Sequence, residues 1–275
     1  MKFYLKLIFN RYDVAIDMHE GTRGAVMCFL SFARFKIGGK FARRSFLYNT
    51  KINFSDLKPT VPLDYQVALI SKLGVPFENP QPIIHVSDEW QKSARDLLTS
   101  KNFDPEKPYC IIHPGARKYD QWQFEKFARI AEYFFTRFNL GIILTCGPGE
   151  FGQVEKLTQC LPKKVSYTFI STDLSTLLGI TASAKFVVCH NGGYMHASSA
   201  IGIPVAALFG LTDYRIWKPL GEKSVVLHKD IDCWPCTSKT MKQDCWDGKP
   251  ECKELISAED VVNSIKTLCP EFSDK

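Results

Sequence analysis

The sequence lacks an apolar run long enough to cross a membrane. Its longest apolar stretch, residues 25–35, is about half the length that spans a bilayer, and Arg34 interrupts it. Lys6 and Arg11 break up the opening residues, and no small-residue cleavage site follows them, which argues against a secretory signal. The chain also has no internal repeat and no low-complexity segment. We therefore expect no membrane-spanning helix and a cytoplasmic protein.

The composition is that of a folded protein. Hydrophobic residues make up 45% of the chain, charged residues 23% and aromatic residues 13%, which excludes disordered, collagen-like and coiled-coil proteins. A chain of 275 residues exceeds what one compact core usually holds, so we expect two domains. A polar, proline-punctuated stretch at residues 104–108 marks a junction. The predicted domains are residues 1–104 and 105–275.

Positive charge is concentrated in the first segment. Residues 1–58 hold eleven lysines and arginines against four acidic residues, a net charge of +7, whereas the whole chain carries +6 and the remainder therefore −1. A basic face on one domain suggests an anionic partner, such as a phosphorylated lipid, an acidic sugar or a nucleic acid. An ordinary solvated face is the alternative.

The hydrophobic pattern predicts an α/β protein with parallel sheets covered by helices on both faces, because short apolar β-rich runs alternate with helical patterns. The predicted strands are residues 12–17, 109–113, 140–146, 165–170, 186–189 and 204–209. The predicted helices are residues 25–35, 62–73, 88–101, 124–138 and 257–268, one that ends at residue 184 and a short one that begins near residue 196.

Eight of the ten cysteines fall into two kinds of position. Cys28, Cys110, Cys146 and Cys189 lie in or beside apolar runs, where cysteine acts as a small buried hydrophobic residue, and we assign them no function. Cys233, Cys236, Cys245 and Cys252 form a tail cluster with C-x2-C spacing followed by two single cysteines. Four such thiols can hold a tetrahedral metal, pair as disulfides or remain free, and a reducing cytosol favours free thiols over metal.

Residues 147–152 match the dinucleotide-binding pattern G-x-G-x-x-G between a strand and a helix, with Asp173 further on. Three features weaken a nicotinamide site. An earlier strand–helix unit precedes the motif, Pro148 lies where the backbone should wrap a pyrophosphate, and the following helix is short. An NAD-dependent dehydrogenase therefore stays a lesser alternative.

The loop at residues 190–196 joins a predicted strand to a predicted helix. Gly192 and Gly193 let backbone N–H groups approach a ligand, and a helix N-terminus favours negative charge, so the loop predicts a diphosphate cradle. A tight turn without a ligand is the alternative. His196 either donates to a phosphate oxygen or is a partly buried histidine with its own partners.

Several ordered motifs resemble the ADP-heptose:lipopolysaccharide heptosyltransferases, glycosyltransferase family 9. The run NGGYMHASSAIGIPVAALFGLT at residues 191–212 is the longest match. The sequence YDVAID at residues 12–17, Gly-Val-Pro at 74–76, His-Pro-Gly-Ala at 113–116 with Trp122, Gly-Pro-Gly-Glu at 147–150 and the tail cysteines agree in the same order. The resemblance covers nearly the whole chain.

The resemblance implies a GT-B architecture of two Rossmann-like domains, with the donor nucleotide-sugar on the second. It implies that the glycine loop and the following helix bind the diphosphate, that a glutamate like Glu150 contacts the ribose and that the backbone near Thr172 approaches the base. The residues it assigns to the donor are Arg117, Lys118, Glu150, Thr172, Asn191, Gly192, Gly193 and His196.

The resemblance also implies the partners and the reaction. Arg23, Arg43 and Arg44 would face an acidic, lipid-linked saccharide acceptor of the lipopolysaccharide core at the inner membrane surface. The reaction is an inverting transfer, in which a base removes the acceptor proton and protein dipoles stabilise the departing diphosphate. Neither a cofactor nor a metal is implied, and no nucleic-acid partner is expected.

The chain departs from the family pattern at the donor loop and before Trp122. Asn191 and Gly192 stand where the family has an aspartate and a serine or threonine. Asp120 stands where a lysine is usual, with Arg117 and Lys118 upstream as substitutes. A carboxylate beside a diphosphate would repel it.

A second departure concerns the beginning of the chain. The family's opening strand, glycine loop and helix, which carry the proposed catalytic base, have no counterpart, so the first domain is expected to be incomplete. Asp13, Asp17 and His19 are the nearest candidates, and none is assigned as the base. A catalytically silent nucleotide- or partner-binding protein of the same family is therefore the alternative to an active enzyme.

Overall fold

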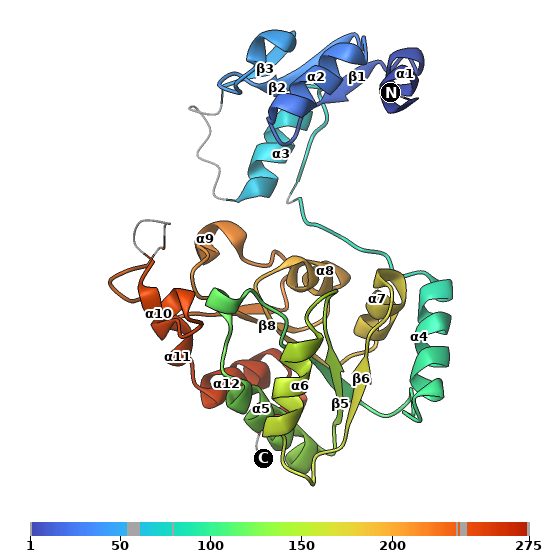
Figure 1. Cartoon of the computed structure of the whole chain (residues 1–275). Coiled ribbons are helices and arrows are strands. Elements are labelled where there is room, and N and C mark those ends of the chain that lie inside the picture. The colour runs from blue at the N-terminus through green and yellow to red at the C-terminus, as the bar shows by residue number, and fades with distance from the viewer. Residues whose placement is uncertain (1, 54–60, 79, 235, 237–240, 274–275) are drawn as a thin grey trace. The chain divides into compact units, whose positions relative to one another are not determined.

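The computed structural model describes residues 2–53, 61–78, 80–234, 236 and 241–273. The chain forms two compact units, Met1–Pro80 and Gln81–Lys275, both built around a parallel sheet (Figure 1). The division falls earlier in the chain than the boundary predicted after residue 104.

Helix α4 (Asp88–Ser100) explains where the division falls. It packs against α7 (Leu174–Ala182) of the second unit. Gly179 makes this close packing possible, since a Cβ at that position would lie 2.3 Å from the backbone oxygen of Trp90. Ala94 and Leu98 of α4 are buried in the core of the second unit. The proline-rich stretch at residues 104–108 is therefore a connection within a unit.

The first unit has a three-stranded parallel sheet in the order β1-β2-β3. Its elements are α1 (Lys2–Phe9), β1 (Val14–Ile16), α2 (Thr22–Leu30), β2 (Phe35–Gly39), η1 (Ser45–Leu47), β3 (Thr50–Ile52) and α3 (Pro62–Ser71). Two small buried clusters hold them together, one around Ala25, Cys28 and Tyr48, the other around Ile37, Ile52 and Leu69. The predicted helix over residues 25–35 is wrong in its second half, because the chain turns at Phe32, with φ of 51°, and enters β2.

The second unit has a six-stranded parallel sheet in the order β6-β5-β4-β7-β8-β9. The strands are β4 (Tyr109–His113), β5 (Gly141–Thr145), β6 (Tyr167–Ile170), β7 (Val187–His190), β8 (Val205–Leu208) and β9 (Ser224–Leu227). The remaining elements are η3 (Lys118–Asp120), α5 (Phe124–Phe138), α6 (Phe151–Cys160), α8 (Gly193–Ile201), α9 (Tyr214–Trp217), α10 (Gln243–Trp246), α11 (Glu251–Glu254), α12 (Ala258–Leu268) and η4 (Pro270–Phe272). Successive strands extend in opposite directions from β4 and β7, which makes that pair the switch point of the sheet.

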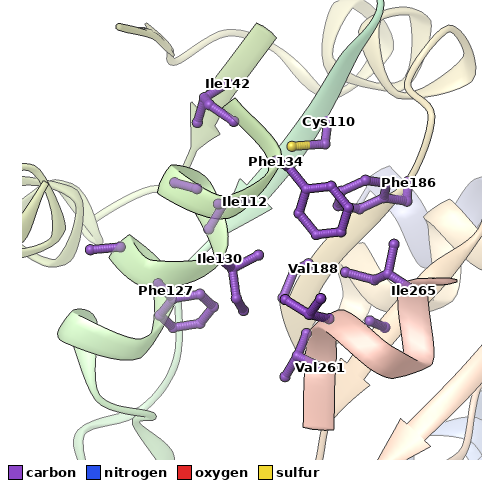
Figure 2. Close-up of a cluster of buried hydrophobic side chains, with 14 of the residues drawn as sticks. Cys110, Ile112, Phe127, Ile130, Phe134, Ile142, Phe186, Val188, Val261 and Ile265 are labelled. Atoms are coloured by element: carbon purple, nitrogen blue, oxygen red, sulfur yellow. The ribbon is translucent and has the colours of Figure 1, made fainter. Parts of the chain in front are cut away.

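Both faces of this sheet are covered, as the all-buried central strands require. One face packs against α5, α6 and α12 around Phe134 and Phe186, the cluster drawn in Figure 2. The other face packs against α4, α7 and α8 around Tyr109 and Met195. Alternate residues of β4 point to the two faces, with Cys110 and Ile112 in the first cluster and Ile111 in the second.

The predicted α/β architecture with parallel sheets is confirmed. The predicted strand at residues 109–113 and the predicted helix at residues 124–138 coincide with β4 and α5. Strands β2, β3 and β9 were not predicted. Within the described ranges, no helix combines the length and the apolar composition needed to cross a bilayer.

Candidate functional site

A cavity of about 720 Å³ opens at the carboxyl edge of the six-stranded sheet, at the β4–β7 switch point. Ligands of open parallel sheets bind in such a crevice, and the volume lies in the usual range for small-ligand sites. Four strand ends supply the lining residues. They are residues 113, 115–117 and 120 at the end of β4 and beyond it, 146–148 and 150 after β5, 172–174 and 177 after β6, and 190–194 and 197 at the end of β7 and beyond it.

The N-terminus of α8 faces this cavity. Gly192 and Gly193 line the cavity and are exposed, and a Cβ at either position would meet no atom within 4 Å. The first backbone N–H groups of a helix have no partner within it, and the helix dipole adds positive potential there. The loop and the helix therefore offer a site for an anion. Because Gly192 and Gly193 have no side chains, an anion can approach the backbone there.

The carboxylate of Glu150 contacts residues at the ends of both β4 and β5. Its Oε2 accepts the N–H of Gly147 at 2.8 Å and lies 3.7 Å from His113 Nε2. Gly115 makes room for the carboxylate, because a Cβ there would lie 2.0 Å from Oε2. The first amide of the G-x-G-x-x-G motif is thus occupied by the chain's own glutamate.

Asp173 is a helix cap. Its carboxylate accepts the N–H of Thr176 at 3.0 Å and the hydroxyls of Thr176 and Thr172 at 2.8 and 3.2 Å. Hydrogen bonds to Ser175 and Thr176 hold the pKa of Asp173 well below its usual range. In a nicotinamide site, the amides of the glycine loop would bind the pyrophosphate and the acidic residue would bind the ribose. Here the Gly147 amide binds Glu150 and the Asp173 carboxylate caps α7. The dehydrogenase alternative is therefore not favoured.

His113 is a buried cavity residue to which the sequence analysis assigned no role, although it belongs to one of the family motifs. Its Nδ1 lies 2.9 Å from Thr145 Oγ1, and its ring lies 4.5 Å from that of Tyr194. Burial lowers the pKa of His113 to about 4, so the imidazole is neutral at pH 7. The sequence signals for it were the His-Pro-Gly-Ala motif at residues 113–116 and its place at the end of a predicted strand.

His190 connects β7 to the loop after β4. Its Nδ1 donates to the carbonyl of Gly115 at 3.2 Å, while its Nε2 accepts the N–H of Trp122 at 3.0 Å. Burial, together with the charge of Lys253, lowers the pKa of His190 well below its usual value. The neutral ring therefore fixes one wall of the cavity.

Six of the eight predicted donor residues lie together around the cavity: Arg117, Glu150, Thr172, Asn191, Gly192 and Gly193. Asn191 donates from Nδ2 to Thr212 Oγ1 at 2.8 Å, and its buried Oδ1 has no hydrogen-bond partner among the described residues. Lys118 and His196 are exposed and do not line the cavity, although Ala197, the residue after His196 in α8, does.

The predicted acceptor arginines belong to the first unit. Arg23 lies in the first turn of α2, which follows β1, and Arg43 and Arg44 precede η1, after β2. All three are exposed. Because β1 and β2 are parallel, the three arginines follow the carboxyl edge of the same sheet.

Asp17 is a structural carboxylate of the first unit. It is buried and accepts the N–H groups of His19 and Glu20 at 3.1 and 2.9 Å and the hydroxyl of Tyr48 at 2.7 Å. Asp13 is exposed and precedes β1, at the amino edge of the sheet, and His19 is exposed. These three hydrogen bonds join the end of β1 to the start of the next loop and to Tyr48, which is a structural role for Asp17.

The tail cysteines are all free thiols, two of them buried (Cys245 and Cys252) and two partly buried (Cys233 and Cys236). Burial, with the neighbouring thiols Cys233 and Cys245, raises the pKa of Cys236 to about 11. In the part of the chain that the structure describes, no three His, Cys, Asp or Glu side chains are arranged to hold a metal ion.

Comparison with known proteins gives a consistent result. The model of "Glycosyltransferase family 9 (heptosyltransferase)" matches residues 1–247. Lipopolysaccharide heptosyltransferase 3 of Escherichia coli strain K12 is 25% identical over 271 residues, 95% of this chain and 76% of that protein. Lipooligosaccharide heptosyltransferase 2 of Haemophilus influenzae is 24% identical over 237 residues, 81% of this chain and 67% of that protein.

Solved structures share the fold. The ADP-heptose lipopolysaccharide heptosyltransferase II of E. coli superposes with a TM-score of 0.79 at 17% identity, over 98% of this chain and 80% of that one. A family 9 glycosyltransferase of Veillonella parvula gives a TM-score of 0.80 at 20% identity, over 98% and 77% of the two chains. The predicted GT-B fold is therefore confirmed.

Proposed function

Because this chain belongs to glycosyltransferase family 9, we propose that it moves a heptose from an ADP-heptose-like donor to an acceptor of the lipopolysaccharide core. The observation that carries the proposal is the cavity at the β4–β7 switch point, which is lined by the open Gly192–Gly193 loop and by the N-terminus of α8. The first backbone N–H groups of a helix have no partner within the helix and are free to bind an anion. Family membership makes the chain a glycosyltransferase.

The donor would occupy this cavity with its diphosphate at the start of α8. The backbone N–H groups after Gly192 and the Arg117 guanidinium supply the positive side of the site. Glu150, held by Gly147, presents its carboxylate to the ribose hydroxyls, and the backbone at Thr172 approaches the base. Leu174 and Leu177 offer the base an apolar surface.

The transfer breaks the bond between the anomeric carbon and the diphosphate oxygen and forms one between that carbon and an acceptor oxygen. The proton of the acceptor hydroxyl passes to a base, and the leaving diphosphate takes up the electron pair. Main-chain N–H groups at α8 stabilise the charge that develops on this leaving group.

The acceptor would be an acidic, lipid-linked saccharide at the cytoplasmic face of the inner membrane. Arg23, Arg43 and Arg44 would bind its anionic groups, since guanidinium groups form paired hydrogen bonds with carboxylates and phosphates. Their exposure along one sheet edge and the +7 charge of residues 1–58 support this role.

The test is an assay of the full chain with radiolabelled ADP-heptose and Kdo-lipid A. We expect label in the lipid fraction. Calorimetry with ADP on the same preparation separates the alternatives. ADP binding without transfer would indicate a catalytically silent nucleotide-binding protein. If the chain neither binds ADP nor transfers heptose, the proposed use of the cavity is contradicted.

A further inference from the structure

A buried ion pair lies at the wall of the cavity. Lys253 Nζ is 3.5 Å from Asp120 Oδ1, and their side chains are 1% and 4% exposed. Lys253 also donates to the backbone oxygen of Leu208 at 2.9 Å, at the end of β8. Asp120 is the member of the pair that lines the cavity.

Gly210 leaves the space that the two side chains of the pair occupy. A Cβ on Gly210 would lie 2.7 Å from both Asp120 Oδ1 and Lys253 Cε. The chain just after Lys253 is fixed by two hydrogen bonds to the carbonyl of Ile256, from Trp122 Nε1 at 3.1 Å and from Lys126 Nζ at 2.8 Å. The lysine is therefore held in place from several sides.

Stability does not account for this arrangement. Taking two charges out of water costs several kcal/mol each, and apolar residues of similar volume often serve a fold as well or better. The Asp120 Oδ1 atom, moreover, is buried without any hydrogen bond among the described residues, so the pair is imperfect as a structural bridge. A buried ion pair of this geometry, with one member lining the cavity, therefore points to a role in the cavity.

The electrostatic balance at this wall supplies such a role. His190, a titratable side chain that lines the cavity and is close enough to Lys253 to feel its charge, is neutral. The negative charge of Asp120 would by itself oppose a diphosphate in the cavity, and the ammonium of Lys253 offsets it.

We propose that Lys253 is a positioning residue of the donor site: it neutralises Asp120 and thereby makes the cavity wall accept the diphosphate of the nucleotide. This inference rests on the proposed function, because it takes the cavity as the donor site. It assigns the neutralisation of Asp120 to a residue of the cysteine-containing tail, far along the chain from Asp120 itself.

The test is calorimetry of the full chain with ADP and, separately, with adenosine, which has the same base and ribose but no phosphate. Asp120→Asn keeps the shape of the side chain and leaves the ammonium unopposed, so ADP should bind about tenfold more tightly. Lys253→Met leaves the carboxylate unopposed, so ADP should bind about tenfold more weakly. The double variant should return near the wild-type affinity, and adenosine binding should change less than about twofold throughout.

Lys242→Met is the matched control, because Lys242 forms an exposed ion pair with Glu251 of α11, at 2.9 Å, in the same tail. It should leave ADP affinity unchanged. If the Lys253→Met chain does not fold, as judged by thermal denaturation, Asp120→Asn alone decides the question.

Each outcome separates the two proposals. A wild-type chain that binds no ADP contradicts the proposed function itself. A wild-type chain that binds ADP, with Asp120→Asn binding it no more tightly, overturns the role of Lys253 while the donor site stands. If ADP and adenosine binding change equally, the pair only supports the fold, and the proposed role of Lys253 is overturned as well.

Discussion

The two units differ in how completely they bury their apolar surface. In the second unit, β4, β5, β7 and β8 are buried along their whole length, and helices cover both faces of the sheet. In the first unit β1 is only partly buried, and several large side chains face solvent, such as Phe9 and Phe46, each 74% exposed. The cavity loops of the second unit therefore rest on a fully packed sheet, whereas the exposed arginines of the first unit rest on a sparser core.

The first prediction concerns stability and has the largest expected effect. Phe134→Ala should lower the free energy of unfolding by about 3–5 kcal/mol, because Phe134 is fully buried between Phe186 and Phe272. Phe46→Ala, the matched aromatic in the first unit, should change it by less than about 0.5 kcal/mol. Chemical denaturation measures both. Similar losses for the two variants would contradict the difference between the units.

The second prediction concerns the anion site. Gly193→Asp should weaken ADP binding about a hundredfold, since a carboxylate at the start of α8 repels the diphosphate, although the cavity has room for the side chain. Gly193→Ala should change the affinity less than about threefold. If the two variants bind ADP equally well, the diphosphate does not lie at α8.

The third prediction is a pH dependence that belongs to the second unit. The pKa of His113 is about 4 in the folded chain and about 6.5 in the unfolded chain, so the unfolded state takes up the proton first as the pH falls. Stability present above pH 6.5 should therefore be lost toward pH 4, by about 2 kcal/mol more than in His113→Gln. Denaturation at several pH values measures the difference. His19→Gln, at an exposed histidine of the first unit, should follow the wild-type curve.

The fourth prediction has the smallest effect and concerns the first unit. Replacing Arg43 and Arg44 by alanine should raise KM for the acceptor about tenfold and leave ADP affinity unchanged, since both arginines lie outside the nucleotide cavity. Arg34→Ala is the control, because Arg34 is equally exposed but precedes β2, at the amino edge of the sheet. Equal effects of the two changes would indicate general charge attraction in place of a site.

The sequence predicted the second unit well because its local signals agree with its tertiary structure. Strand β4 is a continuous apolar run between prolines, and α5 carries phenylalanines at helical spacing that all meet the same core. Strand β2 could not be predicted, because Gly38 and Gly39 are poor strand formers. They are glycines because Tyr48 and Glu20 occupy the space where their side chains would stand. That reason is tertiary, and no local pattern contains it.

The candidate site divides in the same way. The loops around the cavity could be predicted, because the carboxyl ends of parallel strands meet at one edge and residues such as Glu150 and Asn191 follow those ends directly. The partner of Asp120 could not, since Lys253 comes from a short helix that is more than a hundred residues away in the chain. The neutral state of His113 depends on burial by Tyr194 and Thr145, which the sequence alone does not bring together.

The close contact between α4 and α7 decides how the second unit can be produced by itself. A recombinant fragment beginning at residue 105 would omit α4 and expose the face of the sheet that Ala94 and Leu98 now cover, including Tyr109 and Ile180. Such a fragment would aggregate through that uncovered face. Starting at Gln81 keeps the helix, and with it the backbone hydrogen bond from Ile84 to Ala200 at the end of α8.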